Sequence, residues 1–459
     1  MKGVSAMLEW KDKKILIVGT GISGIAAAKL LDKLARVVLY DANDKLMEAE
    51  VRKKLPEDFA GSIALGAMTE EVKQGLDYVV LSPAVPTDLP DVLDLKKRGV
   101  TILGEIELAY QYAKGDIVAI TGTNGKTTTT ALVGEIMRNY FESVHVVGNI
   151  GIPYTERAPL MTEDSVTVAE ISSFQLETIL EFHPKVSAIL NITPDHLDRH
   201  HTMENYIAAK GDIAKNQTAE DVCVLNYEDA ALQELAKGIK AQICWFSSAR
   251  CLEKGLYTRD GHIYYNDGAK EIDVCAVEEM NIIGRHNHEN AMTAIAMGIA
   301  MQVPMECIRK ALREFVAVEH RIEYVTTKKG VKYYNNSKGT NPDASIQAVR
   351  AMTTPTVLIA GGYDKGSEYE EWIDCFEDKI KCLVLMGQTR DKIAEAARGR
   401  GFHDIVMVES MEEAVSFAAA HTKPGETVLL SPCCASWGMF KNYEERGNIF
   451  KTLVRALED

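Results

Sequence analysis

Residues Ile120 to Thr130 read ITGTNGKTTTT, and this stretch decides the fold of the region around it. The apolar run DIVAI precedes it and the helix-like segment TTTTALVGEIMRNY follows it. A glycine-rich turn between a strand and a helix is the context of a phosphate-binding loop. The loop is shorter than the common G-x-x-x-x-G-K-[ST] pattern, because only Thr123 and Asn124 separate Gly122 from Gly125-Lys126-Thr127.

The chemistry of such a loop follows from its residue types. Its backbone N–H groups bind phosphate oxygens, Lys126 reaches the β and γ oxygens, and Thr127 can ligate Mg²⁺. The residues that we predict to bind ATP here are Gly122, Thr123, Asn124, Gly125, Lys126, Thr127 and Thr128.

Short apolar runs alternate with helix-length segments along the whole chain. Strands that are apolar on both faces and separated by helices predict an α/β protein with mainly parallel sheets covered by helices. The runs that we expect to be strands are 14–19, 37–41, 77–82, 116–122, 165–170, 186–193, 221–226, 356–362, 382–387, 404–409 and 427–432.

The 459 residues suggest about three domains at roughly 150 residues each. We place one boundary before the strand that leads into the loop and the other where a helical stretch gives way to EHRIEYV. The predicted domains are a Rossmann-like domain over 1–114, a P-loop ATPase-like domain over 115–317 and a Rossmann-like domain over 318–459.

Composition excludes several classes of function. A formal net charge of −15 argues against a nucleic-acid or anionic-membrane surface. The nine cysteines are scattered without a C-x-x-C pair, so we expect neither a disulfide framework nor a zinc site. The first residues lack an apolar signal region, and no stretch reaches roughly 18 uncharged apolar residues. We therefore expect a cytoplasmic protein without membrane insertion.

A second glycine-rich turn, VGTGISG, follows the first expected strand. Gly19, Gly21 and Gly24 with Asp41 at the end of the next strand match the dinucleotide fingerprint G-x-G-x-x-G plus an acidic residue. A nucleotide-type ligand and a turn that only packs a helix on a strand both remain open. Ser82, after a later strand, lies where it would line the same crevice.

Further polar residues follow strands of the central region. Glu170 ends VTVAE, and NITPDHLDRH supplies Asp195, His196, Asp198 and Arg199. Carboxylate and imidazole groups beside a phosphate-binding loop are candidates for holding one or two Mg²⁺ ions. Lys210, in NYIAAKGDIAKN, would by its own context be a solvated helix lysine.

These motifs together resemble the Mur ligases, and the resemblance runs from Gly19 to Gly447. The short loop is shared with folylpolyglutamate synthase, whereas SSFQLE, SPCCAS and FKNYEERG resemble the D-glutamate-adding branch of the family. The motifs that carry the resemblance are TGTNGKTTT, GNIG, EISSFQLE, NITPDHLDRH, RHNHEN, EHRIEYV, NNSKGTNPDA and LLSPCCASWGMFKNYEERG.

The resemblance implies an ATP-dependent amide-bond-forming ligase of peptidoglycan precursor synthesis. In this family the γ-phosphoryl group passes to a substrate carboxylate, and the amine of an amino acid attacks the resulting acyl phosphate. The implied substrates are UDP-N-acetylmuramoyl-L-alanine, D-glutamate and ATP, with two Mg²⁺ ions and a monomeric enzyme.

The family's functional residues carry over position by position. Lys126, Glu170, His196 and Lys210 match catalytic positions, and the implied metal ligands are Thr127, Glu170, His196 and a carbamylated Lys210. Asn287, Asn290 and Arg321 match further ATP contacts. The implied substrate contacts are Gly21, Asp41, Ser82, Asn149, Ser172, Asp195, His196, Lys338, Thr340, Lys365, Ser436 and Tyr443. The chain departs from the family at Asn336, where Asp is usual, and at Tyr443, where Phe is frequent.

Three alternatives remain. A nicotinamide-dependent dehydrogenase would explain GTGISG and Asp41 but not the phosphate-binding loop. A regulatory nucleotide-binding protein would leave Glu170, His196 and the third domain without a role. Another Mur ligase or a folylpolyglutamate synthase-like ligase is disfavoured by SSFQLE.

Overall fold

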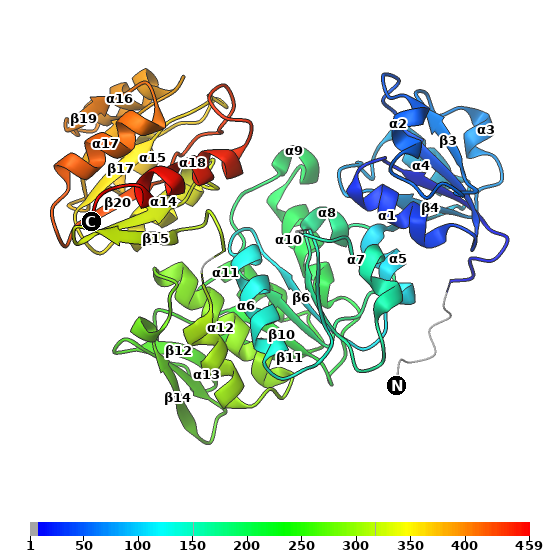
Figure 1. Cartoon of the computed structure of the whole chain (residues 1–459). Coiled ribbons are helices and arrows are strands. Elements are labelled where there is room, and N and C mark those ends of the chain that lie inside the picture. Colours follow the sequence, from blue (N-terminus) through cyan, green and yellow to red (C-terminus); the bar gives the residue numbers. More distant parts are fainter. Residues whose placement is uncertain (1–7, 150, 317) are drawn as a thin grey trace. The chain divides into compact units, whose positions relative to one another are not determined.

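The computed structural model describes residues 8–149, 151–316 and 318–459. It contains three sheets with flanking helices (Figure 1), so the predicted α/β class with three mainly parallel sheets is confirmed. The described chain packs into two compact units. One runs up to Val277 and adds Glu289–Leu312, and the other combines Glu278–His288 with Arg313–Asp459. The domain boundaries stay predictions, and Met1 and Ala317 lie outside the described residues.

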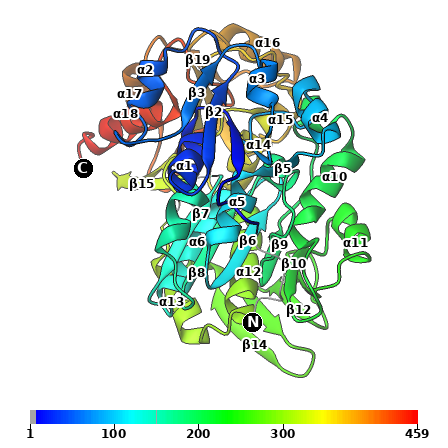
Figure 2. The same cartoon turned by 90° about the vertical axis from the view of Figure 1, so that its right-hand side faces the viewer.

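The first sheet has five parallel strands in the order β3-β2-β1-β4-β5. Figure 2 shows β2 and β3 side by side. The strand order reverses between β1 and β4, and ligands bind at such a point in open α/β sheets. The elements are β1 Lys14–Val18, α1 Ile22–Leu31, β2 Arg36–Asp41, α2 Glu48–Arg52, β3 Ser62–Leu65, α3 Glu70–Lys73, β4 Tyr78–Leu81, α4 Pro90–Lys97, β5 Thr101–Gly104 and α5 Glu105–Tyr112.

The second sheet has the order β14-β13-β12-β11-β10-β9-β6-β8-β7. Its strands are parallel except where β13 pairs with β12 and β14. The elements before β10 are β6 Asp116–Thr121, α6 Lys126–Arg138, β7 Val144–Gly148, α7 Tyr154–Arg157, η1 Ala158–Leu160, β8 Val166–Glu170, α8 Ser173–Leu176, β9 Val186–Ile189, α9 Leu197–His200, α10 Met203–Gly211 and η2 Asp212–Ala214. The elements from β10 onward are β10 Val222–Asn226, α11 Ala230–Ala236, β11 Gln242–Ser247, β12 Gly255–Arg259, β13 His262–Asn266, β14 Glu271–Ala276, η3 Val277–Glu279, α12 Arg285–Ala300 and α13 Met305–Glu314.

The register of this sheet gathers the polar turns at one edge. Ile120 of β6 lies opposite Glu170 of β8, and Gly148 of β7 lies opposite the same glutamate. On the other side, β9 pairs with β6 in parallel, with Thr121 opposite Ile189. The turns after β7, β6, β8 and β9 therefore leave from the carboxyl edge of four adjacent strands, where α/β sheets bind ligands.

The third sheet lies in the second unit and has the order β15-β16-β20-β17-β18-β19. Only the β15–β16 pair is antiparallel. The elements are β15 Glu323–Lys328, β16 Val331–Asn335, α14 Pro342–Ala351, β17 Thr356–Ala360, α15 Glu370–Asp374, β18 Ile380–Leu385, α16 Arg390–Gly399, β19 Ile405–Met407, α17 Met411–His421, β20 Thr427–Leu430 and α18 Tyr443–Arg455.

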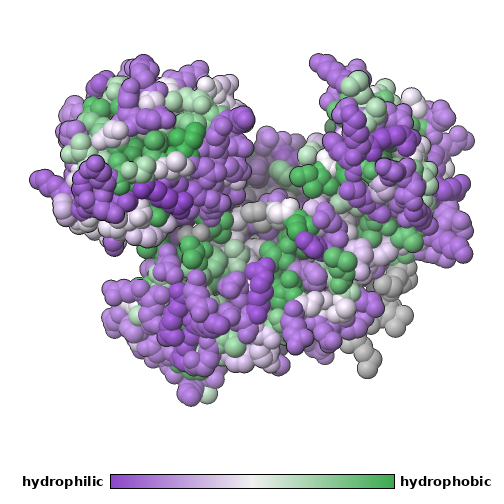
Figure 3. Space-filling model, viewed as in Figure 1, coloured by the Kyte–Doolittle hydropathy of each residue, from purple (hydrophilic) through white to green (hydrophobic). Residues whose placement is uncertain are grey.

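The strand interiors form the cores, because apolar residues on both strand faces are covered by helices. Val118, Ala119 and Ile120 of β6 and Leu358 and Ile359 of β17 are fully buried. Hydrophilic residues predominate on the visible face of both units (Figure 3). In the described parts of the chain, every helix is too short or too polar to cross a membrane.

Candidate active site

The phosphate-binding loop has the backbone that its glycines allow. Gly125 has φ 86° directly before α6, and a Cβ there would lie 2.3 Å from Oδ1 of Asn290. No side chain caps the start of α6, and its first turn holds no acidic residue. The first N–H groups of a helix lack intrahelical acceptors and favour anions. The start of α6 is therefore suited to phosphate.

Two residues that the sequence did not single out hold the loop in place. Oδ1 of Asn191 accepts from the Asn124 backbone N–H at 2.9 Å, and the Asn191 amide donates back to the Asn124 carbonyl at 3.1 Å. The Tyr206 hydroxyl lies 3.0 Å from Oγ1 of Thr123. Asn191 lies near the end of the expected strand 186–193, and Tyr206 precedes Lys210 by four residues on a helix, so both positions carried a signal.

Two lysine side chains converge on one carbonyl of the loop. Nζ of Lys126 and Nζ of Lys210 each donate to the Gly122 carbonyl at 2.8 Å. Lys210 is only 2% exposed, so the expectation of a solvated helix lysine from its own context is wrong. Burial, reinforced by the charge of Lys126 and opposed by Asp195, lowers the pKa of Lys210 to about 7. A large fraction of this amine is therefore neutral near pH 7.

Glu170 carries a buried carboxylate with one unsatisfied oxygen. Its Oε1 accepts from the Asn149 side-chain amide at 2.9 Å, whereas its buried Oε2 has no hydrogen-bond partner within the described residues. An orphaned carboxylate oxygen beside a phosphate loop fits Mg²⁺, which prefers oxygen ligands.

The described ranges contain no group of three or more His, Cys, Asp or Glu side chains that would hold a metal by itself. A Mg²⁺ ion here would need phosphate oxygens and water to complete its shell, as is usual for this ion at nucleotide sites.

The other predicted residues after β8 and β9 make mostly local contacts. His196 has φ 52°, and its ring lies 3.4 Å from Asp195 and packs against Phe174. Ser172 caps α8, because its hydroxyl accepts from the backbone N–H of Gln175.

Arg199 makes its contacts within the first unit. Its guanidinium pairs with Glu177 at 2.7 Å and donates to the Val85 carbonyl at 3.0 Å. The structure places Asp198 in the first turn of α9.

The glycine-rich turn after β1 is tightly packed. A Cβ on Gly24 would lie 1.8 Å from the Gly19 carbonyl oxygen, and one on Gly19 would lie 2.5 Å from Oγ of Ser82. Gly21 has open space at its Cβ position. The Ser82 hydroxyl is buried and has no hydrogen-bond partner within the described residues.

Asp41 is engaged by the same turn. Its Oδ2 accepts from the Thr20 backbone N–H at 2.9 Å and from the Thr20 hydroxyl at 2.7 Å, and its Oδ1 accepts from the Asn43 N–H. Burial opposes ionisation, but these hydrogen bonds outweigh it and lower the pKa of Asp41. The carboxylate therefore organises the turn, and its contact with a nucleotide stays a prediction.

The second unit brings together part of the predicted amino-acid site. Nζ of Lys338 lies 5.3 Å from the centre of the Tyr443 ring. Nζ of Lys365 lies 5.2 Å from the ring of Trp437, an aromatic residue that the sequence did not single out. Ser436 is buried, and the Thr340 N–H donates to the Lys338 carbonyl at 2.9 Å.

Asn336, where the family usually has Asp, is hydrogen-bonded to an uncharged hydroxyl group. Its side-chain amide donates to Oγ of Ser431 at 3.0 Å, and the Ser431 hydroxyl donates in turn to Ser345. No ionised group is needed at position 336 to satisfy this chain of hydrogen bonds.

The three remaining predicted ATP contacts belong to different units. Asn290, in the first unit, accepts from the Thr129 hydroxyl at 3.2 Å and abuts Gly125. Asn287 and Arg321 belong to the second unit. The Asn287 side chain donates to the Ile283 carbonyl at 2.8 Å.

Comparison with known proteins assigns the whole chain to one family. Residues 13–104 match the Mur ligase MurD-like N-terminal domain, 120–298 the Mur ligase middle domain and 320–434 the Mur ligase glutamate ligase domain. The chain is similar to the UDP-N-acetylmuramoylalanine--D-glutamate ligase of Lachnoclostridium phytofermentans, with 62% identity over 97% of this chain and 99% of that protein.

A second relative supports the family assignment, and a solved structure shares the fold. The UDP-N-acetylmuramoylalanine--D-glutamate ligase of Lachnospira eligens is 54% identical over 98% of this chain and 100% of its own length. The crystal structure of the MurF ligase from Thermotoga maritima in complex with ADP has the same fold, with a TM-score of 0.58, 15% identity and coverage of 98% of this chain and 99% of that one. The chain belongs to the Mur ligase family.

Proposed function

We propose that this protein joins D-glutamate to UDP-N-acetylmuramoyl-L-alanine at the expense of ATP, through an acyl-phosphate intermediate, in the cytoplasm as a monomer. The observation that carries the proposal is the convergence of Lys126 and Lys210 on the Gly122 carbonyl at the edge that also holds Glu170. The curated relatives named for this reaction match over nearly the full chain and support the choice of D-glutamate.

ATP is bound by the short loop in this proposal. The N–H groups at the start of α6 bind its phosphates, and Lys126 leaves its two loop carbonyls to neutralise the transferring phosphoryl group. The other predicted loop residues are Gly122, Thr123, Asn124, Gly125, Thr127 and Thr128. Asn287, Asn290 and Arg321 complete the nucleotide site.

Two Mg²⁺ ions would be held by Thr127, Glu170, His196 and a carbamylated Lys210. When bound, Mg²⁺ supplies charge neutralisation for the phosphates and the acyl phosphate. A lysine amine reacts with CO₂ only when neutral, and the lowered pKa of Lys210 provides this form near pH 7. The neutral amine adds CO₂ to form a new N–C bond and loses one proton to solvent, and the resulting carbamate offers oxygen atoms, which suit Mg²⁺.

The substrates occupy the remaining predicted residues. Gly21, Asp41 and Ser82 bind the uridine diphosphate part, and Asn149, Ser172, Asp195 and His196 bind the muramoyl-alanine part. D-Glutamate is a dianion, and Lys338 and Lys365 supply its counter-charges with Thr340, Ser436 and Tyr443. Each of these lysines lies over an aromatic ring, which restricts the position of its ammonium group.

A panel of acceptors and amino acids tests the proposal. Purified protein is incubated with ATP and Mg²⁺, and phosphate release is followed with UDP-N-acetylmuramoyl-L-alanine or other UDP-muramoyl peptides against D- and L-amino acids. We expect sustained release only with UDP-N-acetylmuramoyl-L-alanine and D-glutamate together. Equal turnover with L-glutamate or with another acceptor would contradict the assignment, and tight NADH binding by the first domain would revive a dehydrogenase.

A further inference from the structure

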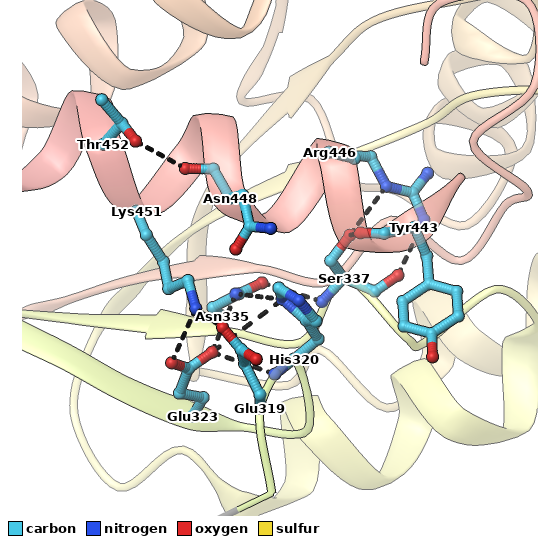
Figure 4. A network of polar contacts seen from close by, with 10 residues as sticks. All are labelled: Glu319, His320, Glu323, Asn335, Ser337, Tyr443, Arg446, Asn448, Lys451 and Thr452. Atoms are coloured by element: carbon cyan, nitrogen blue, oxygen red, sulfur yellow. Dashed lines mark hydrogen bonds and ion pairs between the residues drawn. The ribbon is translucent and has the colours of Figure 1, made fainter. Parts of the chain in front are cut away.

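A buried lysine of the second unit pairs with two carboxylates far from it in sequence. Lys451, on α18, is 6% exposed, and its Nζ contacts Glu319 and lies 3.2 Å from Oε1 of Glu323 (Figure 4). Glu323 is itself buried at the start of β15. This ion pair therefore joins the C-terminal helix to the turn that leads into the third sheet.

The other oxygen of Glu323 holds that turn. Oε2 accepts from the backbone N–H of His320 at 2.9 Å and from the side-chain amide of Asn335 at 3.0 Å. Oδ1 of Asn335 then accepts from the Ser337 N–H at 3.0 Å. One carboxylate thus fixes two backbone segments, one directly and one through Asn335.

Both segments bear on Lys338. The His320 carbonyl accepts from the Lys338 N–H at 3.1 Å, and the His320 ring packs edge-on against Tyr443 with centroids 5.9 Å apart. Arg446, also on α18, donates to the hydroxyl and the carbonyl of Ser337. The backbone that carries Lys338 and the Tyr443 ring near its ammonium group are therefore both connected to this network. Figure 4 shows the network residues, and Lys338 is not drawn there.

We propose that Lys451 is a positioning residue for the amino-acid subsite, acting through Glu323 and His320 on Lys338. The inference deepens the proposed function and rests on Lys338 binding a carboxylate of D-glutamate. Without the lysine, Glu323 becomes a buried carboxylate that has lost its partner on α18, so its side chain moves or draws in water. Either change alters the acceptor that holds His320 and Asn335, and Lys338 shifts with them.

Three substitutions of Lys451 test the proposal through the KM for D-glutamate. Lys451→Met removes the charge at similar volume, Lys451→Gln keeps a neutral donor toward Glu323, and Lys451→Arg keeps the charge. We expect the KM for D-glutamate to rise about tenfold in Lys451→Met and about threefold in Lys451→Gln, and to stay close to wild type in Lys451→Arg, because small displacements of a binding group cost substrate affinity. The KM values for ATP and for the UDP substrate should not change. If Lys451→Met fails to fold, Lys451→Gln against Lys451→Arg carries the test.

Lys381→Met is the matched control. Lys381 pairs with Glu426 in the same unit, in a partly buried pair that also includes a bond to the His421 carbonyl. This variant should lose stability but keep the wild-type KM for D-glutamate. If the KM for D-glutamate rose as much in Lys381→Met as in Lys451→Met, the inference about Lys451 would be overturned. An unchanged KM in both Lys451→Met and Lys451→Gln would also overturn it. Neither result would affect the proposed function. Wild-type turnover that needs no D-glutamate would overturn the proposed function as well.

Discussion

Lys210 and Lys451 are both almost fully buried lysines, yet their surroundings are opposite. Lys451 contacts two carboxylates, Glu319 and Glu323. Lys210 donates to the Gly122 carbonyl, lies 4.6 Å from the centre of the Tyr206 ring and is repelled by the charge of Lys126. A buried charge persists where it is paired and tends to neutralise where it is not. Lys451 is therefore held in an ion pair, whereas Lys210 is arranged to become a neutral, reactive amine.

The comparison separates two uses of one residue type. In the first unit, a lysine that has no salt-bridge partner among the described residues lies beside a phosphate loop and is available for chemistry. In the second unit, a paired lysine fixes the backbone around a binding site. Substitutions at four residues sharpen or break this distinction, in decreasing order of expected effect.

Lys126→Ala should have the largest effect on turnover. Its ammonium is the charge that we assign to the transferring phosphoryl group, and loss of one such group costs about 10²- to 10³-fold in kcat. The fold should survive, because Lys126 lies at a turn between a strand and a helix, where it donates to the Gly122 and Thr123 carbonyls. Steady-state phosphate release and thermal unfolding measure the two quantities. Turnover near the wild-type rate would remove the loop lysine from the mechanism.

Lys210→Met should be nearly inactive, with kcat lowered about 10²-fold or more, because a metal ligand is lost. Acetate should restore part of the activity, since a free carboxylate can occupy the vacated ligand position. Chloride at equal ionic strength serves as the control. Equal rescue by both anions would show that ligand replacement is not the cause.

The same substitution at the two lysines should change stability in opposite directions. Lys451→Met leaves a buried carboxylate unpaired and should lower the free energy of unfolding by about 3 kcal/mol. Lys210→Met removes a buried amine that resists protonation, so it should raise the free energy of unfolding by ~2 kcal/mol at pH 7. This net value allows for the loss of one hydrogen bond. Chemical denaturation in CO₂-free, chelator-containing buffer gives both values.

The size of the Lys210 effect also depends on pH. Its folded pKa of about 7 lies below the usual lysine pKa of 10.5, so between these values the unfolded chain binds more protons and wild-type stability rises with pH. The advantage of Lys210→Met should therefore shrink from pH 7 toward pH 10. A constant advantage over this range would mean that Lys210 does not titrate there.

Tyr443→Phe should have the smallest effect, within about threefold in the KM for D-glutamate. The ring carries the contacts with Lys338 and His320, and the Tyr443 backbone carbonyl accepts from the Ser337 hydroxyl. Tyr443→Ala is the contrasting variant and should raise this KM well beyond Tyr443→Phe. Similar values for both would show that the ring does not support Lys338.

The sequence predicted the strands that form long apolar runs but not several strands with polar or short patterns. β13 pairs antiparallel with β12 and β14, and these strands mix polar with apolar residues, as at Arg259 opposite His262. A strand with one solvated face lacks a continuous apolar run. β3, β5 and β7 were missed because they are short and partly exposed.

Site residues that directly follow a strand could be predicted from the sequence. Contacts between residues that are distant in sequence and meet only in the folded chain could not. The phosphate loop and Glu170 stand at strand ends in the sequence. The burial of Lys210 depends on Gly122 and Tyr206, and the role of Glu323 depends on Lys451, which is 128 residues away. The roles assigned to the individual site residues remain predictions.

The most direct measurement of the central claim is carbamate formation at Lys210. Wild-type protein, Lys210→Met and Lys451→Met are equilibrated with ¹³C-bicarbonate, Mg²⁺ and an unreactive ATP analogue, and ¹³C NMR detects protein-bound carbamate. We predict one carbamate resonance in wild type, its loss in Lys210→Met and its retention in Lys451→Met. A wild-type spectrum without the resonance, or a Lys210→Met spectrum that keeps it, would contradict the account.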